Sequence, residues 1–102
     1  MEFHHKPVLF EETIRSLAIR PEGTYIDGTM GGGGHSEAIL KQLATGRLLS
    51  IDQDPDAIQA AGKRLAPYPQ SIRVRGNFSQ MAELVRAQGI DAVDGVLLDI
   101  GV

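Results

Sequence analysis

Residues 24–35 of this chain, TYIDGTMGGGGH, determine which fold the sequence can adopt. The first four residues favour a β-strand, the glycine-rich stretch after them favours a tight turn, and helical spacing of apolar residues begins at His35. Glycines are required where a backbone turns with positive φ or where a ligand approaches the main chain closely. A flexible surface loop is the alternative, but four consecutive glycines carry a high entropic cost there. The stretch therefore predicts a strand–turn–helix unit that binds a ligand.

Strand-like and helix-like segments alternate along the rest of the chain. Before the glycine-rich turn, residues 8–19 have the apolar spacing of a short helix. After the turn, strand-like runs at residues 48–51, 71–75 and 93–100 are separated by helix-like runs that begin near residues 35, 55 and 79. This alternation implies right-handed βαβ units, a parallel sheet of about four strands and an α/β fold.

Two of the expected helices have start signals. Asp54 precedes Pro55, so the aspartate is expected to cap the helix and the proline to occupy its first position. Ser79 is expected to cap the helix that follows the third strand.

The last strand-like run contains Gly95-Val96-Leu97-Leu98, which is typical of a strand buried on both faces. An open sheet that ended on such a strand would expose an apolar edge, which natural proteins avoid. We therefore expect residues 1–102 to be the amino-terminal part of a larger domain.

The composition limits the classes of function. The chain is 42% hydrophobic with a net charge of −3, which gives a core but no overall electrostatic footprint of a nucleic-acid binder. It has no cysteine, which excludes disulfides and thiolate metal sites, and a single histidine beside the glycines gives no case for a metal. The polar start and the lack of a long apolar run indicate a cytoplasmic protein that does not span a membrane.

Asp52 ends the second strand-like run, roughly 20 residues after the first glycines. A carboxylate at this point can accept hydrogen bonds from both hydroxyls of a ribose. A solvated surface carboxylate is the alternative, and the neighbouring Asp54 is better explained as a helix cap. The pattern favours a cofactor that contains a nucleoside.

The glycine pattern distinguishes two such cofactors. The dinucleotide fingerprint needs glycine or alanine at its third position, which falls here on Ser36 or, one residue later, on Glu37. A nicotinamide oxidoreductase is therefore disfavoured. Asp27 with Gly31 and Gly33 instead resembles the first motif of class I methyltransferases, in which the acid and the turn hold the amino-acid part of S-adenosylmethionine.

Two further strand ends carry candidate residues. Phe78 follows the third strand, where its ring can flank an adenine or can pack as a hydrophobic staple before the helix. Asp99 follows the fourth strand, where the methyl group and its acceptor meet in such enzymes, although a simple strand-ending turn is the alternative.

Five stretches carry a closer resemblance: residues 5–12 (HKPVLFEE), 25–36 (YIDGTMGGGGHS), 51–55 (IDQDP), 76–79 (GNFS) and 94–102 (DGVLLDIGV). In order and spacing they resemble the bacterial ribosomal RNA small subunit methyltransferase H family. The resemblance covers essentially the whole chain. It implies a class I S-adenosylmethionine-dependent methyltransferase fold, a Rossmann-like parallel sheet that is incomplete here.

The resemblance also implies an activity and a set of site residues. The activity is methylation of the N4 of a cytidine in the decoding region of 16S ribosomal RNA, with the small-subunit RNA or the 30S particle as partner. The residues that match those holding S-adenosylmethionine are Gly33, Gly34, His35, Asp52, Phe78 and Asp99. Many amino methyltransferases have an acid or Asn followed by Pro-Pro and an aromatic residue at the fourth strand end. This chain has DIGV there, so the catalytic group is not assigned and Asp99 is only a candidate.

Members of the family are about three times this length, which corresponds to a complete domain plus an inserted subdomain. The sequence therefore allows a second hypothesis, a non-catalytic fragment that retains only the cofactor-binding half of the site. It does not specify an oligomeric state.

Overall fold

The structure, a computed structural model, describes residues 14–28 and 33–98. Residues 14–16 are helical, and the start of the helix expected over residues 8–19 lies outside the described residues. The elements that follow are β1 (Thr24–Asp27), α2 (Gly34–Leu40), β2 (Arg47–Asp52), α3 (Pro55–Leu65), β3 (Ser71–Arg75), the 3-10 turn η1 (Phe78–Gln80), α4 (Met81–Ala87) and β4 (Gly95–Leu97). The alternation of strands and helices expected from the sequence is confirmed.

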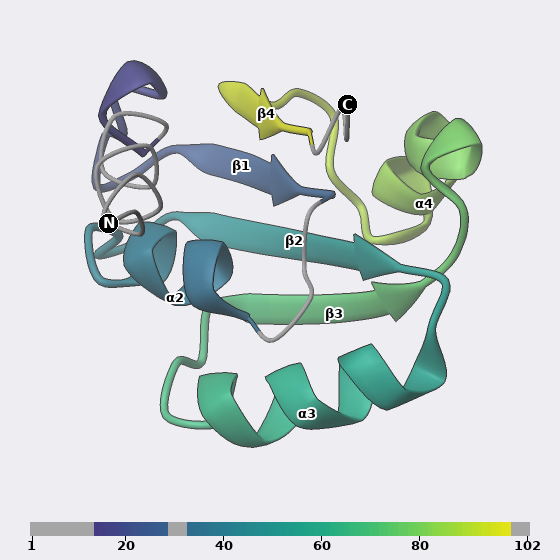
Figure 1. The fold of residues 1–102 in the computed structure, drawn as a ribbon. Helices are drawn as coiled ribbons and strands as arrows, with labels where there is room; N and C mark the ends of the chain where they lie inside the picture. The colour runs from purple at the N-terminus through teal and green to yellow at the C-terminus, as the bar shows by residue number, and fades with distance from the viewer. Residues whose placement is uncertain (1–13, 29–32, 99–102) are drawn as a thin grey trace, which may run out of the picture.

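The strands form a parallel sheet in the order β3-β2-β1-β4 (Figure 1). The chain proceeds outward from β1 through β2 to β3, and then returns to the other side of β1 as β4. In open parallel sheets, ligands bind beyond the carboxyl ends of the strands near such a reversal.

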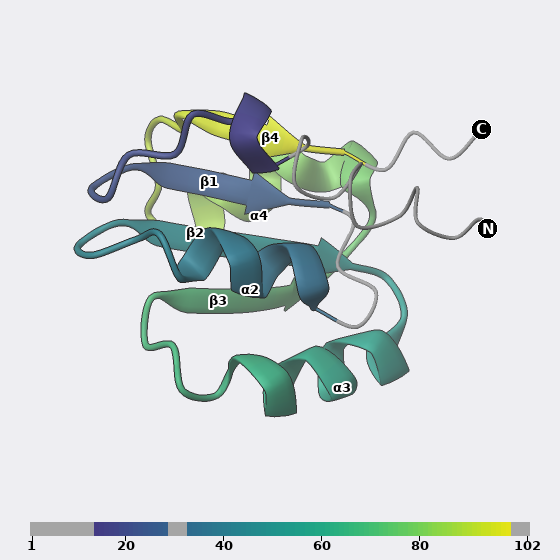
Figure 2. The same cartoon turned by 60° about the vertical axis from the view of Figure 1, so that its left-hand side comes forward.

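The sheet lies between two helical layers (Figure 2). Strand side chains alternate between the two faces, so one face buries Tyr25 and Leu48 against α2 and α3, with Ile39 and Leu65 contributed by the helices. The other face buries Ile26, Leu49 and Ile51, against which α4 packs Met81, Leu84 and Val85. The reversal of direction after β3 places α4 on the opposite face, because each βαβ connection is right-handed.

The last strand differs from the expectation of a strand buried on both faces. Among the described residues, β4 pairs with β1 alone and forms an edge of the sheet. Leu97 is buried, but Val93 and Leu98, which flank the strand, are 37% and 46% exposed. The apolar run correctly predicted a strand. The strand is less buried than expected because, within the described part of the chain, it has a neighbouring strand on one side alone.

The two expected helix caps have different outcomes. The Asp54 carboxylate accepts a hydrogen bond from the backbone N–H of Asp56, with Pro55 at the first helical position, so this cap is confirmed. Ser79 does not cap α4, because it lies inside η1 and its own backbone N–H donates to the side-chain oxygen of Asn77. Asn77 therefore begins this turn, two residues before the expected cap.

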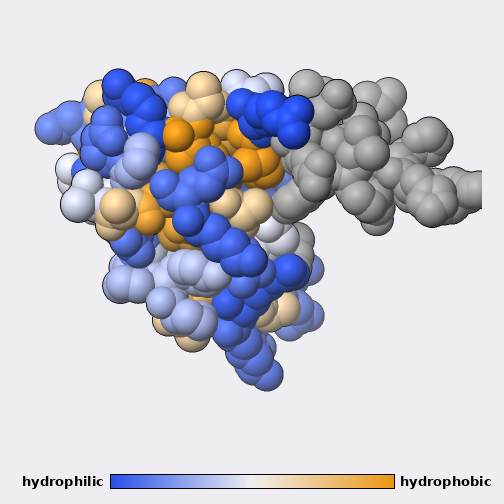
Figure 3. All heavy atoms as spheres, turned by 90° about the vertical axis from the view of Figure 1, so that its left-hand side faces the viewer, coloured by the Kyte–Doolittle hydropathy of each residue, from blue (hydrophilic) through white to orange (hydrophobic). Residues whose placement is uncertain are grey.

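The amino ends of the strands lie opposite the site described below. The partly buried Leu17, Ile19 and Leu43 pack there against the core that lies between the sheet and the helices α2 and α3. Figure 3 shows hydrophobic residues in the middle of this end of the molecule, with hydrophilic side chains around them. Among the described residues, no helix has the length and apolar character needed to cross a membrane.

Candidate functional site

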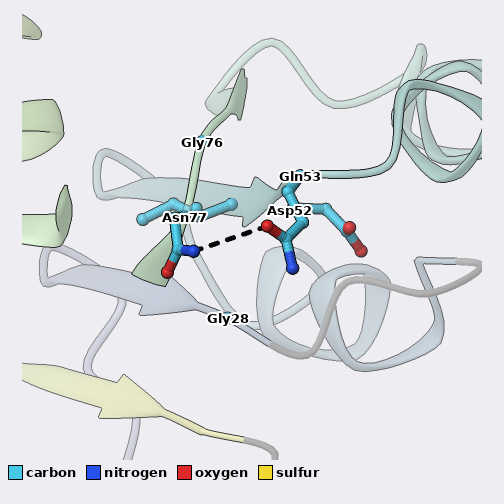
Figure 4. A pocket seen from close by; sticks show the side chains of 6 residues that line it. Gly28, Asp52, Gln53, Gly76 and Asn77 are labelled. Atoms are coloured by element: carbon cyan, nitrogen blue, oxygen red, sulfur yellow. Dashed lines mark hydrogen bonds between the residues drawn. The ribbon is translucent and has the colours of Figure 1, made fainter. Parts of the chain in front are cut away.

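A cleft lies at the carboxyl ends of β1, β2 and β3 (Figure 4). Its volume is about 150 Å³. Pockets that enclose a drug-sized ligand usually measure roughly 300 Å³ or more, so this cleft has room for one part of a cofactor. Its lining residues are Gly28, Ile51, Asp52, Gln53, Gly76 and Asn77.

Asp52 is the charged residue of this lining. It ends β2, and its Oδ1 accepts a hydrogen bond of 2.8 Å from the backbone N–H of Asp54. No described residue donates to its Oδ2, and the side chain is only partly buried. The sequence expectation that this carboxylate faces a ligand is consistent with its place in the cleft, because a carboxylate oxygen accepts two hydrogen bonds.

Two amide side chains lie beside Asp52. Asn77 Nδ2 donates to Gln53 Oε1 over 3.4 Å, a long hydrogen bond drawn in Figure 4. Asn77 Oδ1 accepts from the Ser79 backbone N–H at 3.0 Å, which orients the amide. The cleft therefore offers carboxylate and amide groups, the donors and acceptors that a ribose or a nucleobase edge requires.

Sequence reasoning missed Gln53, Gly76 and Asn77 as lining residues. The available signal was their position, since each lies within two residues of the carboxyl end of a strand. Gly76 has a packing reason to be glycine: a Cβ there would lie 2.7 Å from the Leu84 side chain of α4.

The expected site residues of the glycine-rich turn lie at the start of α2. Gly33 is the residue before the helix and has φ +90°, a left-handed conformation that favours glycine. Gly34 and His35 are the first helical residues and are partly buried. These three residues do not line the cleft, whereas Gly28, the last described residue before the turn, does.

The two remaining expected residues fall at the margin of what the structure describes. Phe78 begins η1 immediately after Asn77, but its side chain lies outside the described part. Asp99 lies wholly outside it. Within residues 14–28 and 33–98, no group of three or more His, Cys, Asp or Glu residues is arranged to hold a metal ion.

Asp27, the acid of the expected methyltransferase motif, is fully buried. Its Oδ2 accepts a hydrogen bond of 2.6 Å from the Ser36 hydroxyl in the first turn of α2. The carboxylate thus links the end of β1 to α2 and is not part of the cleft surface.

An ion pair fixes α2 on α3 close to the glycines. Arg64 Nε lies 2.9 Å from Glu37 Oε1, and the Tyr68 hydroxyl donates to Glu37 Oε2 over 3.2 Å. The hydrogen bond from Arg64 lowers the pKa of Glu37. The hydrogen bond from Tyr68 lowers this pKa as well, whereas desolvation raises it. Desolvation and the hydrogen bond to Glu37 raise the pKa of Tyr68. The Arg64 stem also lies 3.4 Å from the position that a Cβ on Gly33 would occupy.

Residues 2–102 match the model of the MraW methylase family. The chain belongs to this family. Among curated relatives, Ribosomal RNA small subunit methyltransferase H 2 from Agathobacter rectalis is 54% identical over an alignment that covers 100% of this chain and 33% of that protein. The chain thus spans about a third of the length of the curated relatives that it matches.

Solved structures show the same fold. An rRNA methylase from Streptococcus thermophilus superimposes with a TM-score of 0.71 over 91% of this chain and 53% of that one, at 17% identity. A SAM-dependent methyltransferase from Aquifex aeolicus gives 0.59 over 67% of this chain and 38% of that one, at 14% identity. The sheet with its two helical layers is therefore the class I S-adenosylmethionine-dependent methyltransferase fold expected from the sequence.

Proposed function

We propose that this chain provides the cofactor-binding part of an enzyme that transfers a methyl group from S-adenosylmethionine to the N4 of a cytidine in the decoding region of 16S ribosomal RNA. The observation that carries the proposal is the position of Asp52 in a cleft at the ends of three parallel strands, in a chain of the MraW methylase family. The substrate is the small-subunit RNA or the 30S particle, which agrees with the printed names of the curated relatives.

Each part of the cofactor has a proposed place. Asp52 binds the ribose hydroxyls, and Phe78 flanks the adenine. Gly33, Gly34 and His35 hold the amino-acid end. Asp99, which lies outside the described residues, is proposed to position the methionine end of the cofactor or the amino group that accepts the methyl. The donors and acceptors of Asp52, Gln53 and Asn77 fit a nucleoside, and residues 33 to 35 have no bulky side chain before the imidazole.

The bound cofactor supplies the reactive methyl, since its sulfonium is a good leaving group. The protein then has to align the cytosine amino nitrogen with that methyl and exclude water. The exocyclic amine lies inside a paired stack, so the cytidine must be single-stranded or flipped out. A nicotinamide cofactor is disfavoured, because the place of the third glycine is occupied by Ser36, whose hydroxyl is committed to Asp27.

Calorimetric titration of the purified chain with S-adenosylhomocysteine tests the cofactor part. We expect micromolar binding that Asp52→Ala abolishes, and no binding of NADH. Tight NADH binding without S-adenosylhomocysteine binding would refute the proposal.

Methyl transfer is tested separately with labelled S-adenosylmethionine and small ribosomal subunits that lack the modification. After digestion to nucleosides, label in N4-methylcytidine supports the full activity. Binding of S-adenosylhomocysteine without transfer supports the narrower alternative, a chain that binds the cofactor without catalysis.

A further inference from the structure

Three polar side chains are fully buried together beneath α2. Asp27, Ser36 and Ser50 are each 0% exposed and are the buried polar residues of the described chain. Ser36 Oγ lies 2.6 Å from Asp27 Oδ2 and 2.7 Å from Ser50 Oγ. Every buried side-chain nitrogen and oxygen in the described part has a hydrogen-bond partner. The cluster is therefore a complete buried network that joins β1, α2 and β2.

The sheet register brings the three residues together. Asp27 and Ser50 are direct neighbours across β1 and β2. They continue the row of Tyr25 and Leu48, two residues earlier on each strand, which belong to the core beneath α2. Helix α2 lies in front of β2 in Figure 2, and the hydroxyl of Ser36 in its first turn is within hydrogen-bond distance of both polar residues. On β1 and β2 this face is apolar at Tyr25 and Leu48 and becomes polar at Asp27 and Ser50, toward the carboxyl ends of the strands.

The number of hydroxyl protons determines the direction of the hydrogen bonds in the network. A serine hydroxyl has one proton to donate, and Ser36 donates it to the Asp27 carboxylate. The contact between the two serines must then be donated by Ser50 and accepted by Ser36. Ser50 thus orients Ser36, and Ser36 stabilises a buried carboxylate.

A buried polar network stabilises a core less than well-packed apolar side chains do. Buried polar groups gain little net stability over apolar ones, but they lose much if a partner is removed or displaced. Their effect is to favour one arrangement of the elements that they join. Here those elements carry Gly28 at the cleft and, directly before Ser36, Gly34 and His35.

We propose that Ser36 and Ser50 are positioning residues for cofactor binding: through Asp27 they fix the start of α2, with Gly34 and His35, relative to the end of β1. This inference rests on the proposed function, in which these residues hold the amino-acid end of S-adenosylmethionine. The three side chains are fully buried and do not line the cleft, so their proposed effect on binding is exerted through the residues that they place.

Two ligands separate positioning from general structural damage. S-adenosylhomocysteine has both the nucleoside and the amino-acid end, whereas 5′-methylthioadenosine has the same nucleoside without the amino-acid end. Dissociation constants for both are measured by calorimetry for the wild type, Ser36→Ala and Ser50→Ala. Ser71→Ala is the matched control. Ser71 lies at the amino end of β3, away from the cleft, and its hydroxyl accepts a hydrogen bond from Arg73.

We expect Ser36→Ala to weaken S-adenosylhomocysteine binding roughly tenfold and to leave 5′-methylthioadenosine binding within about twofold. Ser50→Ala should have the same selectivity with a smaller effect, because the bond from Ser36 to Asp27 remains. Ser71→Ala should change neither constant. If Ser36→Ala shows no cooperative unfolding in urea, the variant is not folded, and the binding constants of Ser50→Ala then test the positioning role.

Equal weakening of both ligands, or unchanged affinity for S-adenosylhomocysteine in a folded variant, would overturn the positioning role. A wild-type chain that binds neither ligand would instead overturn the proposed function itself.

Discussion

Asp52 Oδ1 lies 2.8 Å from the backbone nitrogen of Asp54, and this hydrogen bond ties the carboxyl end of β2 to the start of α3. One oxygen of the carboxylate is therefore held by the fold, while the same carboxylate lines the cleft. The side chain is fixed before a ligand arrives, which reduces the entropy that ligand binding has to overcome.

Replacing Asp52 by asparagine separates these two roles. The asparagine side-chain oxygen can still accept from the Asp54 N–H, so the turn and the stability of the fold should be retained. The negative charge is lost, and hydrogen bonds to charged groups contribute roughly 1.5–3 kcal/mol. We expect Asp52→Asn to bind S-adenosylhomocysteine about 10- to 100-fold more weakly at an unchanged melting temperature. Asp56→Asn, at an exposed carboxylate in the first turn of α3, should bind like the wild type. Equal affinities of Asp52→Asn and the wild type would exclude the ribose contact.

Gly33 and Gly89 test the glycine-rich turn with a matched pair of substitutions. Both residues have positive φ, +90° and +74°, so alanine at either position should destabilise the chain by about 1–2 kcal/mol. A Cβ on Gly33 also contacts Arg64 and Ala61 of α3, whereas a Cβ on Gly89 meets nothing within 4 Å. We expect similar losses of stability by urea denaturation, but weaker S-adenosylhomocysteine binding only for Gly33→Ala. A parallel loss of affinity in Gly89→Ala would show that binding follows overall stability and not the turn.

The ion pair of Glu37 with Arg64 predicts a pH dependence of stability. The hydrogen bond from Arg64 lowers the pKa of Glu37 in the folded chain below its ordinary value of 4.5. The stabilisation is therefore fully present above pH 4.5 and is lost as the pH falls through the lower, folded pKa. The difference in unfolding free energy between the wild type and Glu37→Gln should shrink over this acidic range in urea titrations. Glu83→Gln, at an exposed glutamate of α4 with no ion pair among the described residues, provides the baseline. A Glu37→Gln difference that is constant with pH would contradict the pKa shift.

Local signals in the sequence predicted most of the fold. The third strand was predicted with the bounds that β3 has, because Pro69 and Gly76 delimit its β-forming residues. The helix after the glycines ends at Leu40, although the next glycine, the local signal for a helix end, is Gly46. The reason is a tertiary contact: the backbone N–H groups of Ala44 and Gly46 both donate to the Pro21 carbonyl oxygen, at 2.8 and 2.9 Å. No local pattern carries that information.

The candidate site was predictable in part for the same reason. Asp52 follows a strand at a known distance from the glycines, so its place in the cleft could be predicted from spacing alone. Ser36 and Ser50 are separated from Asp27 by 9 and 23 residues, and only the sheet register and the docking of α2 bring them together. The placements of Phe78 beside the adenine and of Asp99 beside the methyl group stay predictions.

Gly62 gives a prediction of increased stability. It lies inside α3, where glycine costs about 1 kcal/mol relative to alanine because of the backbone entropy lost on folding. A Cβ there would meet only the Arg73 side chain at 3.6 Å, an ordinary van der Waals contact. We expect Gly62→Ala to stabilise the chain by roughly 0.5–1 kcal/mol, which for a domain of this size raises the melting temperature by about 2–8 °C. Gly46→Ala is the contrasting variant, because its Cβ would overlap the Gly23 carbonyl oxygen and the backbone would have to move. A Gly62→Ala chain that melts no higher than the wild type would show that Arg73 does not accommodate the added methyl group.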